Sequence, residues 1–469
     1  MFNSSEEAMQ YIGKQSIEMV DLKFVDLPGR WHHITIPASS VNELLFYKGI
    51  PFDSSSVPGF RGVSCGDMSL IPDVATGFID PFTELATLSF ICNICEADTR
   101  ANISGDPRGV AIRAVKYLRD KLSAESLWLP ELEFYLFDGV AYETGNEFAY
   151  FEFDSAEIDS AESGYYNHSN GGYHALPPAD RYYDIRSEMV HNAEAMGVPI
   201  RYHHHEAGAR GQQEIEIVPA PLLDGADAVM LVKYAVKMTA VRYGLVATFL
   251  PKPLYNESGN GMHFHQFLVK DDKSLFWDDS AEYAHLSDSA LAYIAGILDH
   301  APSLIGITNP STNSYRRLVP GFEAPTKRFY GLANRCAAVR VPKYDDTPQL
   351  KRIEFRSPDG TCNPYLAIAA QLMAGLDGIK RKLDPTTMGF GPYDDNVNHW
   401  SQSKQKRLKN IPESLDAALD ALRKDNDYLI EGNVFDIGTI ERHIEHTSSI
   451  ARDIAQHPTA REMELYFDM

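Results

Sequence analysis

The feature that most constrains this chain is an apolar segment that carries two carboxylates. Glu131 and Glu133 are embedded in residues 130–137, Pro-Glu-Leu-Glu-Phe-Tyr-Leu-Phe. Residues two apart in a β-strand share a face, so both glutamates point to the same side of such a strand. Two carboxylates on an apolar strand are costly unless a positive charge lies between them. The alternative interpretation is that the two glutamates form surface salt bridges. The other segments of the sequence distinguish between these two interpretations.

A second acidic pair is expected on a hairpin. A glycine-rich connection separates Glu206 from Glu214, which lies in residues 212–217, Gln-Gln-Glu-Ile-Glu-Ile. A hairpin here brings the two carboxylates close together, although acids near a hairpin turn are often only solvated. The run His203–His205 resembles a metal site, but adjacent strand residues face opposite ways, so the three rings cannot all bind one ion.

Two more segments place polar side chains on one strand face. His263 and His265 form a His-x-His pair, and residues 351–356 alternate Arg352, Glu354 and Arg356 onto one face. Structural histidines and a cross-strand ion pair are the alternatives. Together with the glutamates, these segments predict an oxygen-rich cage that suits Mg²⁺ or Mn²⁺ better than zinc or copper. Arginines are natural clamps for phosphate and carboxylate oxygens, and the candidates are Arg317, Arg335, Arg340 and Arg356.

The net charge and the absence of known phosphate-binding motifs limit which ligands the protein can bind and how it can bind them. The sequence contains no Gly-x-x-x-x-Gly-Lys-Ser/Thr loop and no dinucleotide fingerprint after a strand, so metals and arginines would have to neutralise any bound phosphates. The formal net charge of −22 argues against a nucleic-acid partner, because backbone phosphates are repelled. A phosphate substrate such as ATP can still enter an acidic site if divalent metals bind first and reverse the local charge.

The length of 469 residues exceeds what one hydrophobic core usually supports, so two domains are expected. The first hundred residues contain strand patterns at 17–24 and 31–36 and a short helix pattern at 41–46. After a boundary near 101–107, strands with acids or histidines alternate with helices, which we expect at 110–122, 185–195, 226–243, 288–298, 364–376 and in the tail from 415. This mixture predicts an α+β fold on a mainly antiparallel sheet.

No segment approaches the roughly 20 uninterrupted apolar residues that span a bilayer. The polar first ten residues show no secretory signal, so we expect a cytoplasmic protein with no membrane partner. The five cysteines form no disulfide or zinc framework, and Cys92 and Cys95 are expected to be buried free thiols.

Three longer motifs resemble those of type I (bacterial) glutamine synthetases. They are residues 309–325 (Asn-Pro-Ser-Thr-Asn-Ser-Tyr-Arg-Arg-Leu-Val-Pro-Gly-Phe-Glu-Ala-Pro), residues 247–253 (Ala-Thr-Phe-Leu-Pro-Lys-Pro) and residues 363–367 (Asn-Pro-Tyr-Leu-Ala). The resemblance runs over essentially the whole chain. It implies a small β-grasp-like domain over 1–103 and a catalytic domain over 104–469, with a curved antiparallel sheet like that of guanido kinases and a helical C-terminal tail.

The resemblance also implies roles for the cage residues. Two or three Mg²⁺ or Mn²⁺ ions would be bound per site, with ATP as co-substrate. One ion would be held by Glu133, Glu206 and Glu214, and another by Glu131, His263 and Glu354. His265, Arg340 and Arg352 would help to bind the nucleotide phosphates. Arg335 would stabilise the transferring phosphate.

The remaining roles concern glutamate and ammonium. Arg317 and Arg356 would clamp the glutamate carboxylate, with Gly259 contributing its backbone. Asp53 and Ser56 would lie on a loop that reaches into the site of a neighbouring subunit. There Asp53 would take a proton from ammonium, in a pocket completed by Tyr173, Glu206 and Glu323. Glu323 would lie on a flap that closes over the intermediate.

The activity implied is ATP-dependent ligation of ammonia to L-glutamate through γ-glutamyl phosphate, in a dodecamer of two hexameric rings. The nearest alternative is a ligase of the same family that glutamylates a polyamine or ethanolamine, and a more remote one is a non-catalytic ring. Several positions depart from the usual pattern, among them Ser258, Phe267 and Gln349. The family's adenylylation loop is not recognisable near 391–396.

Overall fold

The computed structural model describes residues 2–60, 62, 65–157, 164–344 and 346–469. Its N-terminal part is a sheet whose strands run in the order β2, β1, β6, β4, β3. Strands β1 and β6 are parallel, and the other neighbours on this path are antiparallel. The strands are β1 (Met19–Val25), β2 (Trp31–Pro37), β3 (Ile50–Asp53), β4 (Asp67–Pro72) and β6 (Thr87–Glu96). Strands β1 and β2 confirm the two strands predicted near these positions.

Two helices accompany this sheet, α1 (Ser5–Lys14) and α2 (Glu43–Lys48). Helix α2 begins two residues later than predicted, because the Asn42 side chain accepts a hydrogen bond from Leu44 N and caps the helix there. Ala8, Leu22, Leu45 and Phe90 belong to the core of this part. Cys92 and Cys95 are buried free thiols, as predicted.

Helix α3 (Pro107–Leu122) connects this part to the rest of the chain. Its N-cap is Asp106, which accepts from Arg108 N and Gly109 N. The buried guanidinium of Arg108 donates to Asp227 on α5 (Leu222–Arg242) over 3.1 and 2.9 Å, and to Asp73 over 2.9 Å. Because a buried charge is tolerated only when it is paired, this contact fixes the N-terminal sheet against the larger part.

The larger sheet has the order β10, β11, β7, β14, β18, β17, β16 among the described residues. Its neighbours are antiparallel except β16 and β17. The strands are β10 (Ile200–His205), β11 (Gln212–Ile217), β7 (Glu125–Phe137), β14 (Met262–Lys270), β18 (Ile353–Phe355), β17 (Val339–Val341) and β16 (Tyr330–Leu332). Shorter strands β12 (Ala220–Pro221), β13 (Val246–Thr248) and β15 (Lys273–Ser274) pair at its sides, and β8 (Gly139–Thr144) pairs with β9 (Ala149–Asp154). The predicted α+β architecture on a mainly antiparallel sheet is confirmed.

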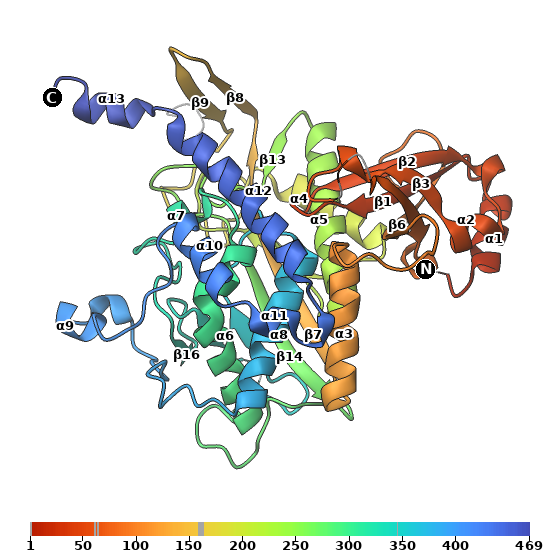
Figure 1. Ribbon diagram of the computed structural model, residues 1–469. Helices are drawn as coiled ribbons and strands as arrows, with labels where there is room; N and C mark the ends of the chain where they lie inside the picture. The colour runs from red at the N-terminus through yellow and green to blue at the C-terminus, as the bar shows by residue number, and fades with distance from the viewer. Residues whose placement is uncertain (1, 61, 63–64, 158–163, 345) are drawn as a thin grey trace.

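Helices cover one face of this sheet (Figure 1). Leu132 and Phe134 of β7 lie in one core with residues of α5 and of α8 (Pro364–Arg381). Helices α3, α8 and α6 (Asp288–Thr308) lie side by side in front of the sheet, and α12 (Ile437–Gln456) runs diagonally toward the upper end of α8. Helix α4 (Tyr183–Ala195) packs on α5, and α10 (Leu415–Lys424) packs on α6. Glu131 and Glu133 of β7 lie on the opposite face, which these helices do not cover.

Helix α6 continues ten residues past the predicted end at 298, through Pro302. An interior proline removes one helical hydrogen bond and usually ends or kinks a helix. Here Leu304 and Ile305 are fully buried, and packing outweighs the lost hydrogen bond. By length and composition alone α6 could cross a membrane, but 83% of its apolar window is buried inside the protein, as in a core helix.

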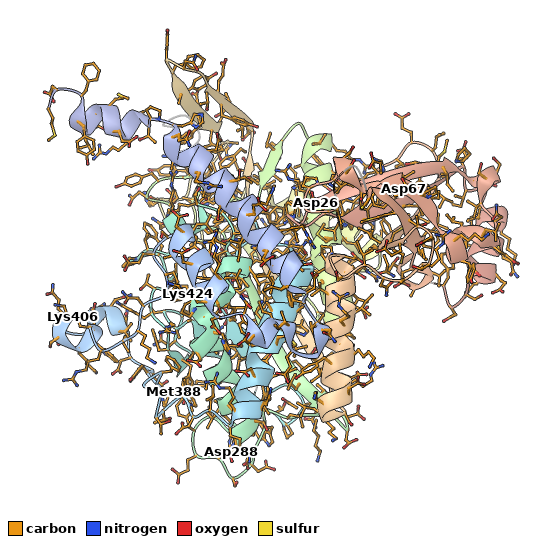
Figure 2. All side chains as sticks on the ribbon, in the orientation of Figure 1. Asp26, Asp67, Asp288, Met388, Lys406 and Lys424 are labelled. Atoms are coloured by element: carbon orange, nitrogen blue, oxygen red, sulfur yellow. The ribbon has the colours of Figure 1, made fainter. Side chains whose placement is uncertain are left out.

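Two segments of the C-terminal part project from the body. One carries α9 (Gln402–Gln405) and is marked by Lys406 in Figure 2, and the other is the C-terminal helix α13 (Ala460–Tyr466) in Figure 1. Residues 460–469 are exposed throughout. The helical tail predicted from 415 is confirmed, and its end makes no close packing with the body in the part of the chain that is described.

Candidate active site

The strand register brings the predicted acids and histidines together. Glu131 of β7 lies opposite His263 of β14, and Glu133 lies opposite Glu214 of β11. His265 of β14 lies opposite Glu354 of β18. Because side chains alternate along each strand, these residues share the face that the helices leave open. The period of two in residues 130–137 therefore predicts the correct face.

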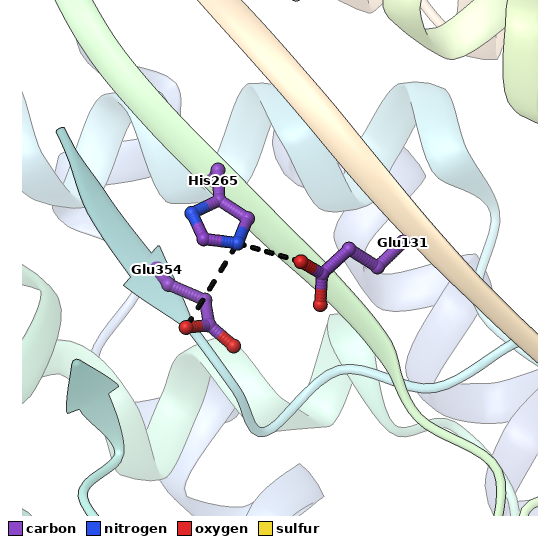
Figure 3. Close-up of side chains that lie close together, drawn as sticks. All are labelled: Glu131, His265 and Glu354. Atoms are coloured by element: carbon purple, nitrogen blue, oxygen red, sulfur yellow. Dashed lines mark hydrogen bonds and ion pairs between the residues drawn. The ribbon is translucent and has the colours of Figure 1, made fainter. Parts of the chain in front are cut away.

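One cluster consists of Glu131, His265 and Glu354 (Figure 3), whose ligand atoms lie within 4.8 Å of one another. His265 Nε2 lies 2.8 Å from Glu131 Oε1, and the guanidinium groups of Arg340 and Arg356 donate to Glu354. Burial opposes ionisation of Glu354, but Arg356, His265 and Arg340 outweigh it and lower its pKa. Burial likewise opposes ionisation of Glu131, and the two histidines lower its pKa well below the ordinary value. Both carboxyl groups of this cluster are therefore ionised at neutral pH.

In the second cluster the pKa values of the carboxyl groups are raised instead of lowered. Ligand atoms of His204, Glu206 and Glu214 lie within 4.8 Å of one another. Burial, Glu214 and Glu133 raise the pKa of Glu206 well above its ordinary value. Burial, Glu131 and Glu133 do the same for Glu214. Two buried carboxyl groups with raised pKa values, beside the carboxylate of Glu133, are suited to a divalent cation, for which they supply oxygen ligands.

His263 lies between the two clusters. Its Nδ1 is 3.2 Å from Glu131 and 3.6 Å from Glu354, and its Nε2 is 3.7 Å from Glu133. Burial and the nearby Arg356 lower the pKa of His263, which favours the neutral ring that a metal requires. His263 thus contacts both carboxylates of the first cluster, and its Nε2 also lies 3.1 Å from Nη2 of Arg317.

His204 is the site residue that sequence reasoning missed. The argument against a three-histidine site holds, but His204 and Glu206 are two residues apart and belong on one face. His204 Nε2 lies 3.3 Å from Glu214. The same two-residue spacing that placed Glu131 and Glu133 on one face was sufficient to predict His204 as a site residue.

A cavity of about 300 Å³ opens onto these clusters. Most of the predicted site residues line it, namely Glu131, Glu133, Tyr173, Glu206, Glu214, Gly259, His263, Arg317, Glu323, Arg335, Arg340 and Arg356. Three predicted residues, His265, Arg352 and Glu354, are buried beside it and outside its lining, and Arg352 Nε donates to His265 Nδ1 over 3.2 Å. Four arginines and five acids therefore face one small volume.

Two glycines allow the chain to approach the arginine on this wall. A Cβ on Gly259 would lie 2.4 Å from Pro251 O and 3.0 Å from Cγ of Arg317. A Cβ on Gly261 would lie 2.4 Å from His263 Nε2 and 2.5 Å from Arg317 Nη2. Arg317 is held by carbonyl groups, with Nη1 donating to Ser357 O over 2.9 Å. The guanidinium is thus fixed before any substrate arrives.

The predicted ammonium pocket is brought together only in part. Tyr173 and Glu323 line the cavity with Glu206, and the Tyr173 ring stacks on His174 with centroids 4.2 Å apart. Asp53 and Ser56 are absent from the described lining, because they belong to β3 and to the short helix η2 (Ser54–Ser56) of the N-terminal sheet. One chain alone does not bring them to its own cavity.

Comparison with known proteins gives a consistent result. A family model described as glutamine synthetase, catalytic domain, matches residues 104–466, and one described as glutamine synthetase, β-grasp domain, matches residues 16–97. The chain is 42% identical over 479 residues to the glutamine synthetase of Frankia alni, covering 100% of both chains. It is also 42% identical over 479 residues to that of Mycolicibacterium smegmatis, covering 99% of both.

Solved structures show the same likeness. The Plasmodium falciparum glutamine synthetase has a TM-score of 0.89 at 26% identity, covering 99% of both chains. GmaS without ligand has a TM-score of 0.81 at 25% identity, covering 98% of this chain and 99% of that one. The likeness includes the small N-terminal domain and the larger domain together.

Proposed function

The chain belongs to the glutamine synthetase family, and from this premise we propose that it ligates ammonia to L-glutamate through γ-glutamyl phosphate. The family's general chemistry, ATP-dependent ligation with divalent metals, is that of this chain. The identity of the amine acceptor and the roles of single residues are the proposal.

The observation that carries the proposal is the acidic cluster with raised pKa values beside fixed arginines in one cavity. We assign one ion to Glu133, Glu206 and Glu214, and a second to Glu131, His263 and Glu354. The raised pKa values of Glu206 and Glu214 support the first assignment. When bound, Mg²⁺ or Mn²⁺ would neutralise phosphate and carboxylate oxygens in the site.

The arginines then supply the remaining positive charge. Arg317 and Arg356 orient the carboxylate of glutamate, and the backbone at Gly259 completes that subsite. The γ-carboxylate attacks the terminal phosphorus of ATP, and ADP leaves. Arg335 and Arg340 stabilise the charge on the phosphate as it transfers. Direct amidation would require oxide to leave, whereas the acyl phosphate offers phosphate as a leaving group.

Ammonia displaces phosphate in the second step. Asp53 of a neighbouring chain takes a proton from ammonium, because only neutral ammonia carries a lone pair. Tyr173, Glu206 and Glu323 line the place where ammonium would wait, and this retained set favours ammonia over a larger amine. His174, stacked on Tyr173, is the residue through which a different acceptor would be selected.

We also propose the assembly and the location. Asp53 lies outside the cavity of its own chain, and the exposed tail α13 projects from the body. These features support sites that are completed by a neighbouring chain, and with the family resemblance we propose a dodecamer of two hexameric rings in the cytoplasm. The division into domains at 1–103 and 104–469 belongs to the same proposal.

The test is phosphate release from ATP by the purified protein with Mg²⁺ and glutamate, comparing ammonium with methylamine, ethanolamine and a polyamine. Turnover that needs ammonium and is lost in Asp53→Ala supports the proposal. Asp67→Ala is the matched control, since Asp67 is the exposed cross-strand neighbour of Asp53. Turnover only with a larger amine would move the assignment to a glutamyl-amine ligase, and no turnover with any acceptor would favour a non-catalytic ring.

A further inference from the structure

The turn that carries Glu323 is held by little of its own structure. Gly321 and Glu323 both have positive φ, 102° and 55°, and Phe322 lies between them. All three residues line the cavity. In the described part of the chain, no hydrogen bond joins residues 321–324 to another segment. Something else must therefore keep the turn over the site.

Lys252 provides a specific contact to this turn. Its Nζ lies 3.7 Å from the centroid of the Phe322 ring, a close cation–π distance. The half-buried ammonium also donates to Glu257 O. Stacking a cation on the ring face is favourable because the face carries negative charge, and partial burial strengthens it.

The base of this contact is rigid. Lys252 N donates to Asn313 Oδ1 over 2.6 Å, and Asn313 Nδ2 donates to Lys252 O over 3.1 Å. Asn313 immediately precedes α7 (Ser314–Arg317), the helix that ends at Arg317. The lysine that contacts the flap is thus fixed to the same element that fixes the predicted glutamate clamp.

We propose that Lys252 is a positioning residue that latches the flap through Phe322, so that Glu323 covers the acyl phosphate and excludes water. This inference rests on the proposed function for its chemical consequence. Water can attack the acyl carbon of γ-glutamyl phosphate, the carbon–oxygen bond to phosphate breaks, and glutamate and phosphate result. The net reaction is then hydrolysis of ATP to ADP and phosphate with no amide formed.

The first measurement is the ratio of phosphate released to amide formed at saturating substrates. In the wild type the ratio is expected to be close to one. Lys252→Met and Phe322→Leu should raise it by about three- to tenfold, the loss expected for one partly buried cation–π contact. Phe322→Tyr keeps the ring and should keep the ratio near one. Lys121→Met is the matched control, because Lys121 Nζ lies 5.5 Å from the Tyr117 ring and neither residue lines the cavity.

The second measurement does not depend on the amine acceptor. Hydrogen exchange of the peptide containing residues 319–325 in the ligand-free protein should be several-fold faster in Lys252→Met and Phe322→Leu, and unchanged in Phe322→Tyr and Lys121→Met. Unchanged exchange in both latch variants would overturn the inference, whatever the activity. Faster exchange in a protein that forms no amide with ammonium would keep the latch and reject the proposed function.

Discussion

Replacing Glu214 by glutamine should stabilise the metal-free protein. Carboxylate oxygens of Glu206 and Glu214 lie within 4.8 Å of each other. Two unit charges at this separation repel by about 3 kcal/mol at an effective dielectric constant of about 20. The raised pKa values let the fold relieve part of this repulsion by binding a proton, so we expect Glu214→Gln to gain about 1–2 kcal/mol at neutral pH.

The pH dependence has a definite sign. Because both carboxyl groups hold protons in the fold that the unfolded chain releases, the free energy of unfolding falls as pH rises above 4.5, the ordinary pKa. This decline should be shallower in Glu214→Gln. With Mn²⁺ present the order should reverse, since an ion at about one hundred times its Kd stabilises the wild type by about 2.7 kcal/mol. The variant lacks one ligand and should lose most of that gain.

The assay is thermal unfolding at a fixed protein concentration and scan rate, after EDTA treatment and again with Mn²⁺. Glu257→Gln is the matched control, because Glu257 is buried near the cavity but accepts from Asn170 N and Ala209 N over 3.1 and 3.3 Å. It should destabilise the metal-free protein and keep the Mn²⁺ shift. A Glu214→Gln protein that is less stable without metal, or that keeps the full Mn²⁺ shift, would refute the assignment of Glu214 as a ligand.

Three further results are expected. Two carboxylates 2.9 Å from its ring nitrogens outweigh burial and raise the pKa of His300 from 6.5 to about 9. The contribution of His300 to the free energy of unfolding is therefore fully present below pH 6.5, and up to ~3 kcal/mol is lost as the pH rises toward 9. His300→Gln should flatten this decline in unfolding experiments at several pH values. Gly261→Ala should lower kcat/KM for glutamate by about tenfold to hundredfold with unchanged circular dichroism, because its Cβ would lie 2.4 Å from His263 Nε2. Co-expressed Asp53→Ala and Arg356→Ala chains should form hybrid oligomers with about a quarter of the sites intact, whereas each variant alone is inactive and a site within one chain would give no recovery.

Much of the site followed from strand periodicity. The period of two placed Glu131 with Glu133 and His263 with His265, because a strand face is a local property of the backbone. Antiparallel pairing then brought these faces together, which no single segment specifies. The resemblance to known glutamine synthetases supplied partners across strands, and the register sets Glu131 opposite His263 and Glu133 opposite Glu214.

The rest depends on tertiary packing or on other chains. Helix α6 continues past Pro302 because Leu304 and Ile305 are buried, and local preference does not reveal this. The contact between Lys252 and Phe322 joins residues 70 positions apart, each ordinary in its own segment. Asp53 lies on the N-terminal sheet, so its role cannot be read from one chain.

The most direct test of the account follows the oxygen atoms of glutamate. The purified protein is given ATP, Mg²⁺, ammonium and glutamate labelled with ¹⁸O in the γ-carboxylate, and the phosphate and the amide are analysed by mass spectrometry. Formation of γ-glutamyl phosphate transfers one labelled oxygen to each phosphate released, with one glutamine formed per phosphate. Phosphate without label, or label lost with no glutamine formed, would contradict ligation of ammonia through an acyl phosphate.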